Sequence, residues 1–269
     1  MSFEHDGWLG EEAQAIARHC ETHFAPNLAV ARRTNILAHK VLRELEFDSR
    51  DSQHLLALAL FVRLLQSAQA AVHLILLGLR HDAAAIIRVS IESLILLKNS
   101  CRDSTFGRGY VVRGSRETLR RTKRGLPDAA RDELDTEMRI RLEVAEAQHR
   151  QIIEKLGEEP NDLRILAGKV GLTELYETAY RLYSASVHSE AGAVASYYER
   201  QQTGAMVMNY NPDWRYTGVY LAEVCDILLR AIESLEELFG KIDSETREEI
   251  VRELEKLSPQ WPDPKRKSV

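Results

Sequence analysis

The fold is decided by the stretch Ala83-Ala-Ala-Ile-Ile-Arg-Val-Ser-Ile-Glu-Ser-Leu-Ile-Leu-Leu97, where apolar side chains occupy nearly every face of a helical projection. A surface helix shows one apolar stripe, whereas a helix that is apolar all round is buried. We therefore expect a helix from about residue 82 to residue 101 that lies inside a helical protein.

The segment before this stretch, residues 55–79, is also strongly apolar. Arg63, Gln66, Gln69 and His73 interrupt it, which argues against a segment that spans a bilayer. We expect a second buried helix here, with Asp51 or Ser52 as its N-cap because short oxygen-bearing side chains accept hydrogen bonds from the first free amides of a helix.

The rest of the chain supports an all-α fold, a long-helix bundle. Only 14 Gly and 7 Pro punctuate stretches that are rich in Leu, Ala, Glu and Arg, and no stretch alternates long enough to predict a strand. Thr173, Ser244 and Pro127 stand at positions typical of helix starts. The further helices are expected at about 9–24, 28–45, 127–156, 161–170, 173–199, 217–239 and 244–257, with a less regular stretch at 102–124 and a loop at 201–214.

Three regions follow from this pattern: an N-terminal helical extension (1–49), a helical bundle core domain (50–240), and a C-terminal charged helix and tail (241–269). The 127–156 helix is more polar than its neighbours, so we expect it to project from the bundle or to bind a partner protein. The alternative is a solvated amphipathic helix.

Composition limits the possible functions. A net charge of −5 argues against coating nucleic acid over the whole surface, although it permits a local basic site. Cys20, Cys101 and Cys225 form no CxxC pair, so buried thiols are expected. The acidic N-terminus does not resemble a signal peptide, and we expect a cytoplasmic protein without membrane contact. The motifs of dinucleotide enzymes, P-loop ATPases, zincins and α/β-hydrolases do not occur in the sequence.

Two stripes run along the segment 176–190. Tyr176, Tyr180, Tyr183 and Val187 form an apolar stripe that is expected in the core or an interface. The second stripe is polar, and its members are Glu177, Arg181, Ser184 and His188. An imidazole that titrates near neutrality and a fixed guanidinium can hold a phosphodiester and move its protons without a metal. The alternative is an ordinary polar helix face.

Two further groups of charges are candidates. Arg88 and Glu92 lie four residues apart in the apolar helix, so we expect a buried pair that either fixes helix register or lines a cleft. The stretch 102–124 contains an excess of arginines with Phe106 and Tyr110 among them, a composition able to follow a phosphate backbone. We expect RNA-binding side chains at Arg113, Arg116, Arg120 and Arg121. The alternative is a solvated basic segment.

Arg88-Val-Ser-Ile-Glu92, together with Tyr183-Ser-Ala-Ser-Val-His188, resembles a bacterial all-helical family known as domain of unknown function 5677. The resemblance covers about residues 50–240. It implies a helical bundle and no particular activity.

Arg181 to His188 also resembles the Arg-x₄₋₆-His motif of HEPN (higher eukaryotes and prokaryotes nucleotide-binding) domains. Those domains are helical bundles, often dimeric, and many are metal-independent ribonucleases of toxin and phage-defence systems. The resemblance implies that Arg181 stabilises phosphate, that His188 acts as the acid–base group, and that two copies meet at a two-fold axis. The residue after the motif Arg is typically polar in active members, whereas here it is Leu182, which also allows an inactive relative that only binds RNA.

Three classes of function remain open. The first is a HEPN-like ribonuclease or RNA-binding effector that forms a homodimer and requires no cofactor. The second is a non-enzymatic protein-interaction module, and the third is a small-ligand protein with a pocket between Arg88, Glu92 and His188. Glu146 and His149 have the Glu-x-x-His spacing of a di-iron helix, but a second such helix is missing, so no metal is expected.

Overall fold

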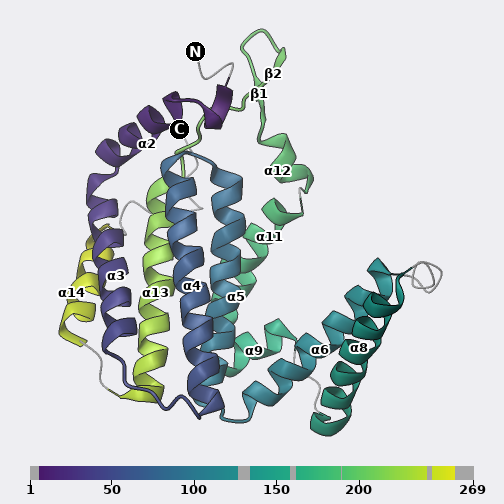
Figure 1. Ribbon diagram of the computed structural model, residues 1–269. Helices are drawn as coiled ribbons and strands as arrows, with labels where there is room; N and C mark the ends of the chain where they lie inside the picture. Colours follow the sequence, from purple (N-terminus) through teal and green to yellow (C-terminus); the bar gives the residue numbers. More distant parts are fainter. Residues whose placement is uncertain (1–5, 127–133, 158–161, 189, 241–243, 258–269) are drawn as a thin grey trace.

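A bundle of long, roughly parallel and antiparallel helices makes up most of the molecule (Figure 1). The computed structural model describes residues 6–126, 134–157, 162–188, 190–240 and 244–257. Within these residues the only strands are β1 (Tyr198–Arg200) and β2 (Met206–Met208), which form one short antiparallel hairpin. The all-α prediction is therefore confirmed.

The helices follow one another in the order of the chain. They are η1 (Gly7–Leu9), α2 (Glu12–His23), α3 (Ala25–Glu44), α4 (Ser52–Leu76), α5 (Arg80–Arg102), α6 (Phe106–Gly125), α8 (Thr136–Leu156), α9 (Leu163–Lys169), α10 (Thr173–Leu175), η2 (Tyr176–Tyr180, a π-helix), α11 (Arg181–Val187), α12 (Ala191–Ala195), α13 (Thr217–Phe239) and α14 (Ser244–Leu257).

Helix α5 lies at the centre of the core, as its composition predicts. It packs along α4 on one side and α13 on another, and α3 packs along α13. Ile87, Ile91, Leu94 and Ile95 of α5 are fully buried. Burial of each such side chain contributes about 1.5–3 kcal/mol to folding, so α5 contributes substantially to the stability of the bundle.

One hydrophobic core extends beyond the central helices. It includes Leu37 and Val41 of α3 and Ile250 of α14, together with residues of α4, α5, α9, α11 and α13. Cys20, Cys101 and Cys225 are buried free thiols, as expected. The division of the chain at residues 49 and 240 stays a prediction, while the core itself runs across both positions.

Helix α4 begins where its N-cap predicts. The carboxylate of Asp51 accepts hydrogen bonds from the backbone amides of Gln53 (2.7 Å) and His54 (3.3 Å). Among the described helices α4 alone is long and apolar enough to cross a membrane, with a mean hydropathy of 1.7 over its most apolar window. Here it packs against α5 and α13, and Gln69 on its outer side donates to the side chain of Asn35.

Two expected boundaries on the polar side of the molecule are wrong. The stretch 102–124 is largely a regular helix, α6, because it contains no proline and its many arginines are good helix formers. The following helix begins at Thr136, where the carboxylate of Asp135 accepts from the amide of Met138 (2.8 Å). Pro127 lies outside the described residues.

The helix expected over 173–199 is interrupted in three places. Thr173 does not cap it, because Leu172 occupies the N-cap position. The chain passes through the π-helix η2 and leaves helical geometry at His188, and only the five-residue α12 follows before β1. A π-turn holds more residues than a turn of α-helix, so it changes which side chains of this segment lie on the same face. Such turns are frequent at functional sites.

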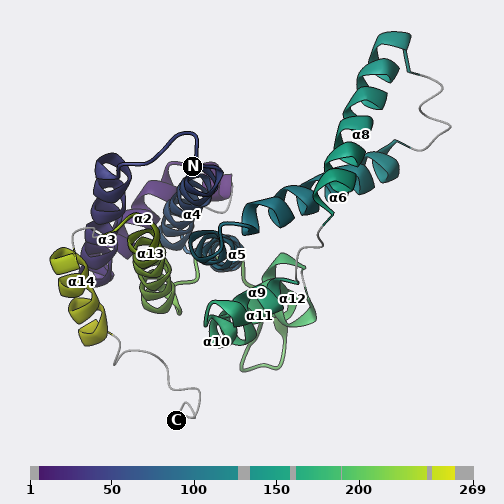
Figure 2. The ribbon, with the colours of Figure 1, turned by 90° about the horizontal axis from the view of Figure 1, so that it is seen from below.

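Helices α6 and α8 form an arm that extends away from the bundle (Figure 2). Glu146 of α8 is buried against α6, and the imidazole of His149 lies 3.2 Å from the hydroxyl of Ser115. Glu146 also accepts from Arg150 (3.0 Å), so the two residues with di-iron spacing are engaged in the arm's own packing. Met138, Ile140 and Val144 of α8 are exposed.

Candidate functional site

The tyrosines of the π-helix form a stacked pair beside α5. The ring centroids of Tyr176 and Tyr180 are 4.8 Å apart, and the planes differ by 18°. The guanidinium of Arg88 lies 4.6 Å from the centroid of the Tyr180 ring and donates to the Tyr180 hydroxyl (2.8 Å). Arg88 also donates through Nε to the hydroxyl of Ser184 (2.9 Å). Arg88 therefore fixes both η2 and α11 against α5.

The expected pair of Arg88 with Glu92 does not form. Both side chains are half-buried, and Arg88 bonds to the 176–184 segment instead. Among the described residues Glu92 makes no hydrogen bond or ion pair, but its charge, together with burial, raises the pKa of the Tyr180 hydroxyl. The pair is replaced because the π-turn brings Tyr180 and Ser184 within reach of the guanidinium.

A cleft of about 820 Å³, here called the basic cleft, opens between α5, α6, η2 and the start of α9, where Asp162 and Leu163 line it. All four arginines expected to bind RNA line it: Arg113, Arg116, Arg120 and Arg121. Arg113, Arg116 and Arg120 follow the i, i+3, i+7 spacing that places side chains on one helical face. Tyr176, Tyr180 and Glu92 line the opposite wall.

The arginines of the basic cleft differ in how much of their charge is neutralised. Arg121 bonds to the carboxylate of Glu117 (3.0 Å) one turn earlier. Arg113 and Arg120 have no acidic partner in the described part of the chain. Tyr110, on the same helix, lines the cleft between these positions and the bundle. The cleft thus combines cationic side chains on α6 with aromatic rings on both walls.

The polar stripe is only partly assembled. Glu177 bonds to Arg164 (2.6 Å) and to Arg181 (2.8 Å), and the hydrogen bond from Arg181 lowers the pKa of this carboxyl. Arg181 is 66% exposed at the side chain. His188 follows the last residue of α11 and is exposed, and no hydrogen bond or ion pair joins it to Arg181 within the described residues.

Tyr183 belongs to the core and has a partner that the sequence analysis missed. Its hydroxyl donates to the carboxylate of Glu223 on α13, and its ring meets Tyr220 edge-on, with centroids 5.5 Å apart. Burial raises the pKa of Glu223 to about 7. The signal was present, because Glu223 stands among Leu221, Val224 and Ile227 on the apolar side of α13.

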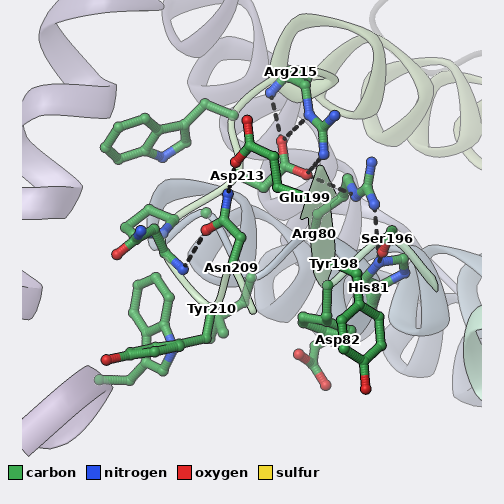
Figure 3. A pocket seen from close by; sticks show the side chains of 17 residues that line it. Arg80, His81, Asp82, Ser196, Tyr198, Glu199, Asn209, Tyr210, Asp213 and Arg215 are labelled. Carbon is green, nitrogen blue, oxygen red and sulfur yellow. Dashed lines mark hydrogen bonds and ion pairs between the residues drawn. The ribbon is translucent and has the colours of Figure 1, made fainter. Parts of the chain in front are cut away.

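A second hollow, here called the hairpin pocket, was not predicted. It has a volume of about 460 Å³ and lies where the start of α5, the β1–β2 hairpin and the segment 209–215 meet (Figure 3). Arg80 and Arg215 both bind the carboxylate of Asp213, at 3.1 Å and 2.7 Å. The only sequence signal is the density of Tyr, Trp, Asn and Pro in a segment that was expected to be a loop.

The hairpin pocket also contains an imidazole held on several sides. Nε2 of His81 lies 2.5 Å from the hydroxyl of Ser196 and 2.9 Å from Nη2 of Arg80, and Nδ1 lies 3.3 Å from the hydroxyl of Ser186. Because an arginine always donates, Nε2 of His81 must be the unprotonated nitrogen. Burial and the charge of Arg80 lower the pKa of His81, which agrees with a neutral ring.

The fold and these two hollows define an all-α bundle protein with a projecting helical arm, an arginine- and tyrosine-lined cleft, and no enzymatic motif of high specificity. The chain belongs to the Family of unknown function (DUF5677), whose sequence model matches residues 54–205. The family resemblance is thereby confirmed, while the resemblance to HEPN domains stays a hypothesis. No curated protein and no solved structure matches the chain.

Proposed function

We propose that this protein binds single-stranded RNA in the basic cleft. The observation that carries the proposal is the cleft itself, in which Arg113, Arg116 and Arg120 of α6 face Tyr176 and Tyr180 of η2. Proteins that bind single strands combine a positively charged groove for the backbone with aromatic rings on which bases stack.

The charge distribution favours a local site over a general affinity for nucleic acid. The chain carries a net charge of −5, so attraction to a polyanion depends on a concentrated patch. Arg113 and Arg120, which lack acidic partners among the described residues, supply that charge without first breaking an ion pair. Tyr176 is half-buried and stacks on the buried ring of Tyr180, so ordering Tyr176 for a base costs little entropy.

The binding proposal is tested by the salt dependence of affinity for a fluorescently labelled single-stranded oligoribonucleotide. Each phosphate contact contributes about −0.7 to the slope of log affinity against log salt for a single strand, so Arg113→Ala/Arg120→Ala should reduce the slope by about 1.4. Fluorescence polarisation between 50 and 300 mM salt gives both slopes.

Arg139→Ala is the matched control, because Arg139 is an exposed arginine of the same arm that does not line the cleft. It should leave the slope unchanged. Equal slopes for the wild type and the double variant, or no binding by the wild type at low salt, would contradict the proposal.

RNA cleavage is a second candidate, and one feature favours it: Arg181 directly follows Tyr180, which lines the basic cleft. An RNA bound there passes close to the segment that carries Arg181 and Ser184. In this hypothesis Arg181 stabilises the charge that develops on the phosphate, and His188 accepts the 2′-hydroxyl proton as that oxygen attacks phosphorus. The bond from phosphorus to the 5′-oxygen of the next nucleotide breaks, this oxygen leaves with a proton from solvent, and a 2′,3′-cyclic phosphate remains. Because Arg181 and His188 are both exposed, a homodimer is proposed to complete the site. A role in toxin or phage-defence systems rests on the HEPN resemblance alone.

The cleavage hypothesis predicts that His188→Ala loses about 10²–10⁴-fold in rate and that Arg181→Ala loses about 10²-fold or more. Arg164→Ala is the control, because Arg164 binds the same carboxylate as Arg181 and is equally exposed but has no proposed role in chemistry. Cleavage of labelled RNA in the presence of a chelator, with folding checked by circular dichroism, measures all three. Equal cleavage by every variant, or none by the wild type, rejects the hypothesis.

Fewer observations support the two remaining classes of function, a protein-interaction module and a small-ligand protein. The exposed Met138, Ile140 and Val144 on α8 are compatible with the partner protein expected at the 127–156 helix. The lining of the basic cleft includes Glu92 but neither Arg88 nor His188, so nothing favours a small-ligand pocket between these three residues.

A further inference from the structure

The hairpin pocket is a candidate binding site separate from the basic cleft. Its residues Arg80, His81 and Asp82 belong to the first turn of α5, whereas Glu92 and Leu96 of the basic cleft lie about 15–24 Å further along the same helix. Trp8 and residues 209–215 complete the pocket and fall outside the 54–205 range of the family match. Residues 78–82 and 196–199 of the pocket lie within the matched range, but a family of unknown function assigns no ligand to them.

We propose that the hairpin pocket binds a small organic cation, with an alkylammonium or guanidinium head group held between aromatic rings and carboxylates. The pocket's volume of about 460 Å³ lies in the usual range of small-molecule sites, about 300–1,000 Å³. Aromatic rings attract cations through the negative charge of their faces, and such rings in groups recognise ammonium ligands.

Aromatic side chains are more frequent in the lining of the hairpin pocket than in the chain as a whole. Five of the 17 lining side chains are Tyr or Trp, whereas 7% of the whole chain is aromatic. Tyr197, Tyr198 and Tyr210 are 42%, 47% and 52% exposed, so part of each side chain is accessible to a ligand. Figure 3 places Tyr198 and Tyr210 on opposite sides of the hollow.

The unneutralised charge of the pocket is negative. Arg80 and Arg215 share the carboxylate of Asp213, so these three groups together carry one net positive charge, whereas Asp82 and Glu199 together carry two negative charges. Asp82 makes no hydrogen bond or ion pair with any other described residue, and Glu199 accepts one bond from the amide of Asn209 (3.2 Å). Figure 3 shows Asp82 below the ring of Tyr198, so a carboxylate and an aromatic ring border the same part of the hollow.

His81, the remaining titratable group of the hairpin pocket, adds no positive charge to it. Nε2 of His81 accepts from Arg80, and Nδ1 faces the hydroxyl of Ser186, so the ring is held as a neutral tautomer. On the other wall Asp213 pairs with both Arg80 and Arg215, and the single positive charge of this group is smaller than the two negative charges of Asp82 and Glu199. A cation is therefore the ligand that the pocket's charge and aromatic content both favour.

The backbone of the pocket is built for close approach. Gly78 has φ = +70°, and a Cβ at this position would lie 2.8 Å from Cβ of Pro212 and 2.9 Å from the amide nitrogen of Asp213. That amide donates to the carbonyl of Gly78 (2.9 Å). The absence of a side chain at residue 78 thus lets the 212–213 backbone carry Asp213 to Arg80, and the wall is preformed.

The test compares choline with 3,3-dimethylbutan-1-ol, which has the same shape without the charge, and with spermidine, by isothermal titration calorimetry on the full chain. Quenching of tryptophan fluorescence reports the same event, because Trp8 and Trp214 line the pocket. We expect the two cations to bind and the neutral alcohol to bind at least tenfold more weakly. Equal binding of choline and the alcohol, or no binding of either cation, overturns the proposal.

Variants locate the binding. Asp82→Asn and Tyr198→Ala should each weaken choline or spermidine by about tenfold, whereas Tyr198→Phe keeps the ring and should stay within about threefold. Glu190→Gln removes an exposed carboxylate that does not line the pocket and should have no effect. Unchanged affinity in both Asp82→Asn and Tyr198→Ala would place the cation elsewhere and overturn the proposal, provided that circular dichroism shows both variants folded.

The same head group occurs on free amines and on the side chains of lysine and arginine. A titration with a short unstructured peptide containing one lysine, against the same peptide with that lysine acetylated, separates the two sources. Tighter binding of the unmodified peptide than of choline indicates a protein or peptide ligand, and tighter binding of choline or spermidine indicates a free metabolite. Both results support cation recognition. Equal binding of the unmodified and the acetylated peptide would show that the pocket does not recognise the lysine ammonium group of a peptide.

Discussion

Glu223 is an acidic residue in an environment that disfavours its charge. It is buried on α13, bonded to the Tyr183 hydroxyl, and faced by Tyr220 and Asp226. Burial disfavours the charged form and raises the pKa to about 7, while the hydrogen bond from Tyr183 opposes part of this rise. The charge state of Glu223 therefore changes with pH near neutrality.

The pH dependence of stability follows from this shift. The unfolded chain has the ordinary glutamate pKa of 4.5, so between about pH 4.5 and pH 7 the folded state binds more protons than the unfolded state. The contribution of Glu223 to the free energy of unfolding is full below about pH 4.5 and falls by about 3 kcal/mol as the pH rises to 7. Glu223→Gln, which does not titrate, should flatten the stability profile in this window.

Urea unfolding of the wild type and the variant at several pH values measures the effect. Glu233→Gln is the control, because Glu233 is a more exposed carboxylate on the same helix that pairs with Lys98. If Glu223→Gln and wild type keep parallel profiles between pH 4.5 and 7, the carboxyl is not the titrating group.

At the scale of elements, the sequence predicts helices well where burial dictates them and poorly where it does not. Helices α4, α5 and α13 were placed within a few residues, because apolar patterning and an Asp51 cap act locally. Helix α6 was missed because only Val112 and Ser115 are buried, so its sequence contains no apolar stripe that would predict a helix. The hairpin was missed because strands of three residues are too short to show alternation.

The basic cleft, too, was predicted from the sequence only in part. The arginines of α6 were grouped because the stretch 102–124 contains an excess of them, and the structure places all four in the lining of one cleft. That three of them share one helical face was not predicted, because the helix itself was missed. Their meeting with Tyr176 and Tyr180 depends on the π-turn and on the direction of the arm, and neither leaves a local pattern. Arg80 and Asp213 are 133 positions apart, so their pairing arises from the packing of the whole chain.

Gly78 shows how one loop conformation supports an element contact. Gly78→Ala meets both a positive φ and the backbone of residues 212–213, whereas Gly171→Ala meets a positive φ of 74° with no atom within 4 Å. The second variant should lose about 1 kcal/mol of stability, and the first should lose about 1–3 kcal/mol. Thermal or denaturant unfolding measures both. A loss at Gly78 no greater than that at Gly171 would mean that the close approach contributes nothing.

The whole molecule consists of one shared core and one arm that lies outside it. The core joins α3, α4, α5, α9, α11, α13 and Ile250 of α14, but it contains no residue of α8. Most of α8 is exposed, and its contacts in the described structure are made mainly with α6. The arm therefore has few of the buried apolar contacts that set local stability, although it supplies the arginines of the basic cleft.

This arrangement predicts two stability classes in native-state hydrogen exchange. Amides of α4, α5 and α13 should exchange only through global unfolding, whereas those of α8 should exchange through a local opening that costs several kcal/mol less, because local stability follows the density of buried contacts. Ala145→Pro, at an exposed position in the middle of α8, removes a helical hydrogen bond at a cost of about 3 kcal/mol or more. Mass-spectrometric exchange should show faster exchange in α8 of this variant while the rates in α4, α5 and α13 stay as in the wild type. An equal acceleration in the bundle would show that arm and core unfold together, since a single cooperative unit transmits the loss to every helix.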